Sequence, residues 1–459
     1  MAAGLAIRVS RWLWSAGYGG WSKGAGLAVT INVVGQAAKR GLIPRIPAPD
    51  KLIEDARAWV TAEYPQHVRS ARVQAGATCP ELWLDLHPAA EPVRVTADEE
   101  GRITGAADTA DAGPGYHTFV GRVIDRLGEH LDIVWSHEHD PRPVGAPAPW
   151  IGAKQPVAER AAVEADHLAL LGRVVDRALE QRRLGHAGVG IGMRPGTRFQ
   201  IDGAVGTPLG PRDDAWLGRA AKDAWAATDI RPWWFDVMDA RYTLQRALVI
   251  LWTEIRWRSP VDDAERAVVD EALSLLRRAL PMDASLAYPW REWAELLRLR
   301  GAPDPIRDRV FRQADQMDAG LPLVGYRRLP VTIVHEGWTF EVPGTFDERV
   351  ADGEWHGGER GRRVTFAATV TQTTNGMPMS ADRFLTEVAG DLVEGVLRHE
   401  DGEIRGRARV TSDSSSGLEV AVLEGFSAVT GSGAAMRVEF DRTEDWQWAL
   451  DLWRSVRPV

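Results

Sequence analysis

The spacing of apolar residues changes several times along this chain of 459 residues, between that of helices and that of strands. Residues 50–64 and 120–131 carry apolar side chains at the spacing of a helix face. Three segments between these helices alternate apolar and polar residues, as half-buried strands do: 71–75, 81–87 and 93–97. The pattern therefore predicts a small α+β domain at 49–140, followed by a proline-rich linker at 141–157.

The period is helical between residues 158 and 325, which predicts a helical domain. A glycine-rich insertion at 185–211 interrupts this domain and is typical of an extended excursion or a hairpin. Residues 272–301, with PWREWAELL in their second helix, resemble one tetratricopeptide-type helical pair. No second copy stands at the period of about 34 residues that such repeats require, so we expect a helical bundle rather than a solenoid.

The last stretch, 331–459, shows paired strands, a helix that begins after Ser380, further strands and a final helix. Its opening GWTFEVP at 337–343 and its closing DWQWALDLWRSVRP at 445–458 resemble the PsbP-like superfamily. The resemblance implies a twisted antiparallel sheet flanked by helices, which binds other molecules and has no shared catalytic residues. One bacterial branch of that superfamily acts as chaperones that hold apolar segments of type VI secretion effectors. The fold class expected for the whole chain is a multidomain α+β protein.

The excess of negative charge in the chain lies in this last domain. Residues 331–459 contain 13 Arg, no Lys and 22 Asp plus Glu, a net charge of −9, and the full chain, with 55 basic and 64 acidic residues, also has −9. The first 330 residues are therefore neutral. Nucleic acid and anionic membranes favour a basic face, so both are disfavoured as partners, whereas basic or amphipathic peptides stay candidates.

The N-terminal arm, residues 1–48, is apolar and aromatic. Neither of its apolar runs reaches the roughly 20 residues of a membrane span, and no small-residue cleavage site follows, so we expect no transmembrane segment and no secretory signal. The arm could pack against the body of the protein or make peripheral contact with a membrane. Cys79 is the single cysteine, which excludes an intrachain disulfide and fits a cytoplasmic protein.

Four residues of the N-terminal domain are candidate metal ligands: His87, His137, His139 and Asp140. His137 and His139 are two residues apart, so they share one face of a strand, and His87 could add a third imidazole from another strand. His117, at a predicted helix start, could act as a general base. A solvated strand end explains the same residues without a metal, because a proline follows Asp140. No nucleotide, cofactor or nucleophile motif accompanies them, so we assign no catalytic residue and no cofactor.

Tryptophan is unusually frequent, with 20 residues. Trp233 and Trp234 are adjacent, so at most one of them faces a helical core, and the other is a candidate for exposure. Trp355 lies in a polar stretch typical of a hairpin. Tryptophan is enriched at interfaces, which makes these three residues candidates for partner binding.

The sequence therefore favours a non-enzymatic bacterial scaffold, adaptor or chaperone. Its protein partner would bind to the acidic C-terminal domain and the Trp-rich helical domain. The alternative is a metal- or His-dependent hydrolase centred on the N-terminal α+β domain. Clustering of the candidate histidines around one point would support the hydrolase.

Overall fold

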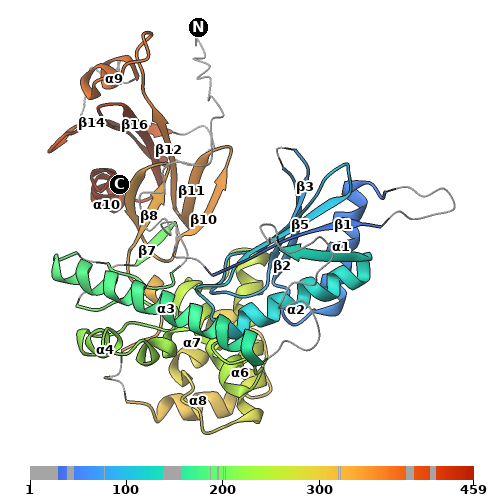
Figure 1. The fold of residues 1–459 in the computed structure, drawn as a ribbon. Coiled ribbons are helices and arrows are strands. Elements are labelled where there is room, and N and C mark those ends of the chain that lie inside the picture. The colour runs from blue at the N-terminus through green and yellow to red at the C-terminus, as the bar shows by residue number, and fades with distance from the viewer. Residues whose placement is uncertain are drawn as a thin grey trace. The chain divides into compact units, whose positions relative to one another are not determined.

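A computed structural model describes residues 29–38, 46–76, 78–137, 157–186, 188–193, 196–199, 201, 203–318, 320, 322–388, 397–413 and 420–459. The chain divides into two compact units (Figure 1). The first unit comprises Ala25–Val331 with Pro343–Thr345, and the described residues of the C-terminal unit lie within Thr332–Val342 and Phe346–Val459. Both units contain helices and antiparallel strands, so the α+β class predicted from the sequence is confirmed.

A six-stranded antiparallel sheet forms one part of the first unit. Its strands are β1 (Thr30–Ala37), β2 (Ser70–Ala75), β3 (Pro80–Asp85), β4 (Val93–Ala97), β5 (Arg102–Asp108) and β6 (Ile133–His137). Their order across the sheet is β2-β3-β4-β5-β1-β6. Strand β1 comes from the segment that the sequence assigns to the N-terminal arm, yet it lies between β5 and β6 and pairs with both.

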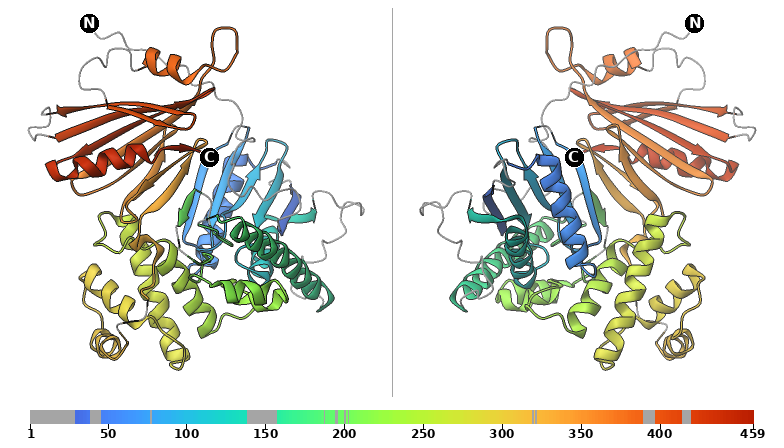
Figure 2. Two further views of the ribbon diagram at one scale, coloured as in Figure 1. Left: turned by 90° about the vertical axis from the view of Figure 1, so that its left-hand side faces the viewer. Right: turned by 90° about the vertical axis from the view of Figure 1, so that its right-hand side faces the viewer.

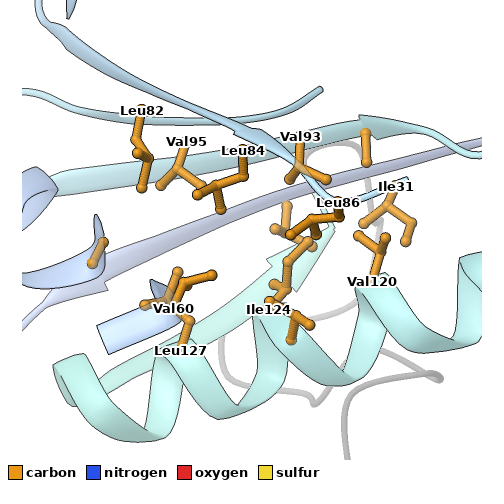
Figure 3. Packing of buried hydrophobic residues seen from close by; sticks show 14 of the residues in the cluster. Ile31, Val60, Leu82, Leu84, Leu86, Val93, Val95, Val120, Ile124 and Leu127 are labelled. Atoms are coloured by element: carbon orange, nitrogen blue, oxygen red, sulfur yellow. The ribbon is translucent and has the colours of Figure 1, made fainter. Parts of the chain in front are cut away.

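Helices α1 (Pro49–Glu63) and α2 (Pro114–Leu131) pack against this sheet. Each has a proline in its first turn, where the missing backbone N–H leaves no hydrogen bond unmade. Figure 3 shows Val60 of α1 and Ile124 of α2 facing Leu84 and its neighbours on the strands. The apolar stripes that predicted the two helices are therefore the surfaces that form this core.

The other part of the first unit is helical. Its helices are α3 (Val157–Arg183), α4 (Asp214–Ala220), α5 (Ala240–Thr253), α6 (Asp263–Met282), α7 (Trp290–Arg300) and α8 (Arg307–Asp315), with the 3-10 helices Ala224–Ile230 and Tyr326–Arg328. Asp213, Asp239 and Asp262 precede α4, α5 and α6, and each carboxylate accepts a backbone N–H of the first turn. In the glycine-rich insertion, the described residues include the short strand β7 (Thr197–Phe199).

The sheet and the helical part share buried residues. Trp233 and Tyr242, from the helical part, belong to the same hydrophobic cluster as α1, α2 and the sheet. The ring centroid of Trp233 lies 5.0 Å from that of Phe119 in α2. Residues 49–140 and 158–325, for which the sequence predicts two domains, thus belong to one compact unit.

The C-terminal unit is built on a seven-stranded antiparallel sheet in the order β10-β11-β12-β16-β15-β14-β13. Its strands are β10 (Asp347–Ala351), β11 (Glu354–Glu359), β12 (Arg362–Val370), β13 (Leu397–Asp401), β14 (Ile404–Asp413), β15 (Val420–Val429) and β16 (Ser432–Phe440). Three further strands lie side by side in the order β17-β9-β8, and they are β8 (Val331–His335), β9 (Trp338–Val342) and β17 (Arg457–Pro458).

Two helices lie on opposite faces of the seven-stranded sheet, as both views of Figure 2 show: α9 (Ala381–Val388) and α10 (Trp446–Arg454). Each helix packs an aromatic side chain against a glycine of a strand. A Cβ at Gly433 would lie 2.4 Å from the Phe384 ring of α9, and a Cβ at Gly425 would lie 2.4 Å from the Trp453 ring of α10. Glycine inside a strand here permits an aromatic ring to approach the backbone.

Within the described part of the chain, no helix has the length and the apolar character that a bilayer-spanning segment needs.

The close contact between the Trp453 ring and Gly425 gives a stability prediction. Gly425→Ala should lower the free energy of unfolding by about 1–3 kcal/mol, because the new methyl group overlaps the indole ring. Gly218→Ala in α4 is the matched control, since nothing lies within 4 Å of its Cβ position, and helix propensity should raise stability by up to about 1 kcal/mol. Urea denaturation measures both. Equal effects of the two substitutions would contradict the packing described for α10.

Candidate protein-interaction site

The candidate histidine His87 is fully buried in an aromatic cluster. Its Nδ1 accepts a hydrogen bond from the backbone N–H of Ala89 at 3.1 Å. Its ring centroid lies 5.6 Å from Tyr116 and 5.9 Å from Trp233. This environment fits a neutral imidazole that belongs to the core of the first unit.

His117 is also buried, and its position is fixed by a short chain of hydrogen bonds. Nδ1 of His117 lies 2.8 Å from Oγ1 of Thr109, and that hydroxyl lies 2.8 Å from the carbonyl oxygen of Val29. The carbonyl can only accept, so the threonine donates to it and the imidazole donates to the threonine. His117 therefore ties α2 to the start of β1, and the edge of its ring meets His167 of α3 at 6.0 Å between centroids.

The remaining metal-ligand candidates lie at or beyond the end of β6. The backbone of His137 pairs with Val33 of β1, and His139 and Asp140 lie outside the described residues. Over the residues that the structure describes, no three His, Cys, Asp or Glu side chains gather in a way that could hold a metal ion. Since His139 and Asp140 lie outside the described residues, the metal site proposed from them stays a prediction.

The three tryptophans proposed for partner binding are buried, so the expectation that one of Trp233 and Trp234 is exposed was wrong. Trp233 is 1% exposed, Trp234 is 7% exposed and Trp355 is 3% exposed. The argument for Trp233 and Trp234 assumed a helix, whereas both lie in the irregular segment before α5. There, adjacent side chains can point in opposite directions. Trp355 lies on the core face of β11, with its ring centroid 5.0 Å from Phe340 in an edge-to-face contact.

Trp233 and Trp234 enter two different cores. Trp233 belongs to the cluster of α1, α2 and the sheet, and Trp234 belongs to the cluster of α3 and α4. The indole Nε1 of Trp234 donates to Glu164 of α3 at 3.3 Å. The two tryptophan side chains therefore anchor this segment in both cores of the first unit.

The exposed apolar residues of this region come directly after the tryptophans. Phe235 is 65% exposed, Val237 56% and Met238 41%. We refer to residues 235–238 as the Phe235 loop. Single exposed apolar residues are ordinary, but three in four consecutive positions form a patch that calls for an explanation. This loop was not predicted from the sequence, because only tryptophans, and not the residues next to them, were considered as candidates for partner binding.

The backbone of the Phe235 loop is fixed at both ends. The N–H of Trp233 donates to the Ala112 carbonyl at 2.9 Å, and the N–H of Gly115 donates to the Trp233 carbonyl at 3.0 Å. Inside the loop, Asp236 accepts two hydrogen bonds from the Arg122 guanidinium of α2, at 2.9 and 2.7 Å. Directly after it, Asp239 caps α5. The apolar side chains are thus presented by an ordered segment.

A half-exposed indole lies close to this segment. Trp225 is 50% exposed, and its ring meets that of Trp234 edge to face, with 5.9 Å between centroids. Aromatic rings of this kind bury a large apolar area when a partner covers them. Trp225 is therefore a further exposed aromatic side chain in this region of the first unit.

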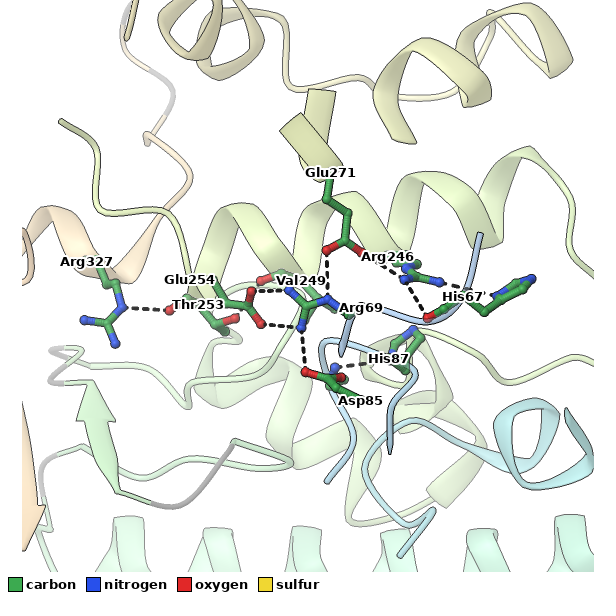
Figure 4. Close-up of polar contacts among 11 residues, drawn as sticks. His67, Arg69, Asp85, His87, Arg246, Val249, Thr253, Glu254, Glu271 and Arg327 are labelled. Carbon is green, nitrogen blue, oxygen red and sulfur yellow. Dashed lines mark hydrogen bonds and ion pairs between the residues drawn. The ribbon is translucent and has the colours of Figure 1, made fainter. Parts of the chain in front are cut away.

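A network of partly buried ion pairs connects the sheet of the first unit to its helical part, as Figure 4 shows. Arg69, just before β2, contacts Glu254 at 2.5 Å, Glu271 at 2.8 Å and Asp85 at 3.3 Å. Arg246 of α5 contacts the other oxygen of Glu271 at 2.8 Å. Burial alone would lower the pKa of Arg69, but the three carboxylates outweigh burial and raise it. The network joins the strands to α5 and α6, so it is a structural joint.

His67 lies beside this network. Burial, with the neighbouring Arg246 guanidinium, lowers the pKa of His67 to about 4. Nη1 of Arg246 lies 3.4 Å from Nδ1 of His67 and can only donate, so the imidazole accepts and is neutral.

No family model and no curated protein matches the chain. Among solved structures, a crystal structure of a protein from Bacteroides thetaiotaomicron VPI-5482 is similar over 27% of this chain and 45% of that one, with 7% identity and a TM-score of 0.23. The chain therefore matches less than half of that protein's length, and the likeness is too low to bear on fold or function.

The ion-pair network gives a second stability prediction. Arg69→Gln should lower the free energy of unfolding by about 3–5 kcal/mol, because it leaves three partly buried carboxylates without their shared cation. The control is Arg57→Gln, which breaks an exposed pair with Glu54 and should change stability by less than about 1 kcal/mol. Chemical denaturation would contradict the role of the network if the two variants lost similar amounts.

The pKa of His67 gives a pH prediction. Its ordinary pKa is 6.5, and its folded-state pKa is about 4, so on acidification the unfolded chain takes up this proton first. The stabilising contribution of the neutral imidazole is present above about pH 6.5 and is lost as the pH falls towards 4. His67→Gln does not titrate, so the stability advantage of wild type over this variant should shrink between about pH 7 and about pH 4.5. Urea denaturation at several pH values measures it, and parallel curves would contradict the assignment.

Proposed function

We propose that this protein is a non-enzymatic bacterial scaffold, adaptor or chaperone of the cytoplasm, and that it binds a protein partner at the Phe235 loop. The observation that carries the proposal is the exposure of Phe235, Val237 and Met238 on a segment with fixed ends. The resemblance of residues 331–459 to PsbP-like domains supports a binding role as well. The lone Cys79 supports the cytoplasmic location.

The energetics of the loop favour association. Full burial of an exposed Val, Met or Phe side chain is worth roughly 1.5–3 kcal/mol, and each of these three, which are 41–65% exposed, would gain about half of that when a partner covers it. Ordering a flexible segment on binding would offset part of that gain. Trp233 and Asp236 already hold this loop, so little conformational entropy is left to lose.

The surroundings of the loop indicate the kind of partner. Arg122 and Asp236 form an ion pair beside the apolar side chains, and Asp239 is exposed at the start of α5. An apolar centre with a charged rim is the usual organisation of a protein interface. An amphipathic segment of a partner protein, with its apolar side toward Phe235, fits this arrangement.

The test replaces the apolar side chains of the loop and leaves its anchors intact. The triple variant Phe235→Ser, Val237→Thr, Met238→Gln should keep the unfolding midpoint of wild type, because none of the three side chains is buried. The matched control is Val261→Thr with Met282→Gln, which removes exposed apolar side chains elsewhere on the same unit. Partners are captured from lysate of the source bacterium, and the leading one is purified and titrated against all three proteins by calorimetry.

The proposal expects the purified partner to bind wild type and the control variant with equal affinity and the triple variant at least about tenfold more weakly, which corresponds to about 1.4 kcal/mol. Equal affinity of the triple variant for every purified partner would show that the loop is not the binding site. A purified partner that is chemically converted by the protein would overturn the non-enzymatic assignment.

A further inference from the structure

The seven-stranded sheet of the C-terminal unit has a core face and a second face with a different composition. Residues that are directly opposite in an antiparallel pair project to the same face, so the strand register assigns each residue to one of them. The core face packs against α10 and against Phe340 of β9. The second face meets α9 at one end, where Phe384 lies over Gly433 (Figure 2). We call this second face the arginine face.

The arginine face is rich in cations. The register places seven arginines on it: Arg349, Arg363, Arg398, Arg405, Arg407, Arg409 and Arg437. The carboxylates with described side chains on the same face are Asp347, Glu354, Glu400, Glu424 and Glu439. Arginines outnumber these carboxylates, although residues 331–459 as a whole have a net charge of −9. The negative charge of the unit is thus concentrated away from this face.

A ladder of ion pairs crosses four strands of the arginine face. Arg409 of β14 contacts Glu424 of β15 at 2.7 Å, and Glu424 also contacts Arg437 of β16 at 3.2 Å. Arg437 contacts Glu439 at 2.9 Å, and Glu439 meets Arg363 of β12 at 3.5 Å. The ladder holds three cations and two anions, and each of its arginines stays at least two-fifths exposed. The ladder therefore orders the guanidinium groups, and its three cations and two anions have a net positive charge.

Two arginines beside the ladder have no carboxylate partner among the described residues. Arg398 of β13 stands directly opposite Arg407 of β14. Two like charges in directly opposite positions destabilise a pair of strands. The next position in the same row is Phe426 of β15, which is opposite Arg407 and only partly buried. The row thus combines two guanidinium groups with an apolar ring.

We propose that the arginine face binds an acidic peptide segment of a partner protein. Carboxylates fit the fork of a guanidinium with two parallel hydrogen bonds, and one placed between Arg398 and Arg407 would remove their repulsion. Arg409 can add a third contact, and Phe426 offers an apolar surface beside it. This site lies on the other unit from the Phe235 loop and does not depend on it.

A short acidic peptide fits this face better than a nucleic acid does. A polyanion that extends beyond the face meets the negative charge of residues 331–459, and Glu424 and Glu439 lie within the ladder itself. Charges separated by more than about 8 Å are screened at physiological ionic strength, so a short segment interacts mainly with the local arginines. Its carboxylates can be spaced to alternate with the two glutamates of the ladder.

The test measures binding of a labelled glutamate peptide to the full chain by fluorescence anisotropy. About six glutamates suffice, since at roughly 3.3 Å per residue they span four strands spaced about 4.8 Å apart. A glutamine peptide of equal length and a single-stranded oligonucleotide are the comparison ligands. The variant is Arg398→Gln with Arg407→Gln, and the control is Arg360→Gln with Arg454→Gln, two exposed arginines outside the face.

We expect the glutamate peptide to bind wild type and the control, and to bind the Arg398/Arg407 variant at least about tenfold more weakly. The unfolding midpoint of that variant should be equal to or above that of wild type, because a repulsive pair is removed. A lower midpoint would mean that the two arginines serve the fold, and the proposal would fail. It would also fail if the glutamine peptide bound equally well, if the control lost as much affinity, or if the oligonucleotide bound more tightly than the peptide.

Discussion

The insertion of two adjacent tryptophans into two different cores is the constraint on which the rest of the first unit depends. Trp233 closes the core between the sheet and its helices, with its ring centroid 4.3 Å from Tyr242 of α5. Trp234 closes the core of α3 and α4. A single peptide bond thus links both cores, and Phe235, the next residue, is 65% exposed.

The ion-pair network around Arg69 is a second contact between the sheet and the helical part of the first unit. It connects the strand side, through Arg69 and Asp85, to Glu254 and Glu271 on the helical side. Buried ion pairs contribute little net stability in general, but they fix the geometry in which the surrounding groups must pack. Hydrophobic burial and ion pairing therefore hold the two parts of the first unit together at different places.

The sequence predicted those parts of the fold in which local pattern and burial agree. The stripe with Ile124 gave α2, and alternation around Leu84 gave β3. Strand β1 was missed, although Ile31 and Val33 alternate with more exposed neighbours, because flanking apolar residues made the segment look like an arm. Its place between β5 and β6 is a long-range pairing that no local pattern encodes.

The candidate sites, too, depend on contacts that no local sequence pattern encodes. Periodicity places side chains only inside regular elements, and Trp233 and Trp234 lie outside them, so one of the two was wrongly expected to be exposed. The net charge of residues 331–459 was read correctly as −9, but its distribution depends on strand register, which brings Arg398 opposite Arg407. Once the register is known, an acidic domain is seen to carry an arginine-rich face.

The most direct measurement of the central claim is site-specific photocrosslinking in living cells of the source organism, with benzoylphenylalanine at position 235 and, as a reference, at the exposed position 261. The account predicts a discrete crosslinked protein at position 235 that is missing at position 261. A product common to both positions, or none at position 235, would contradict it.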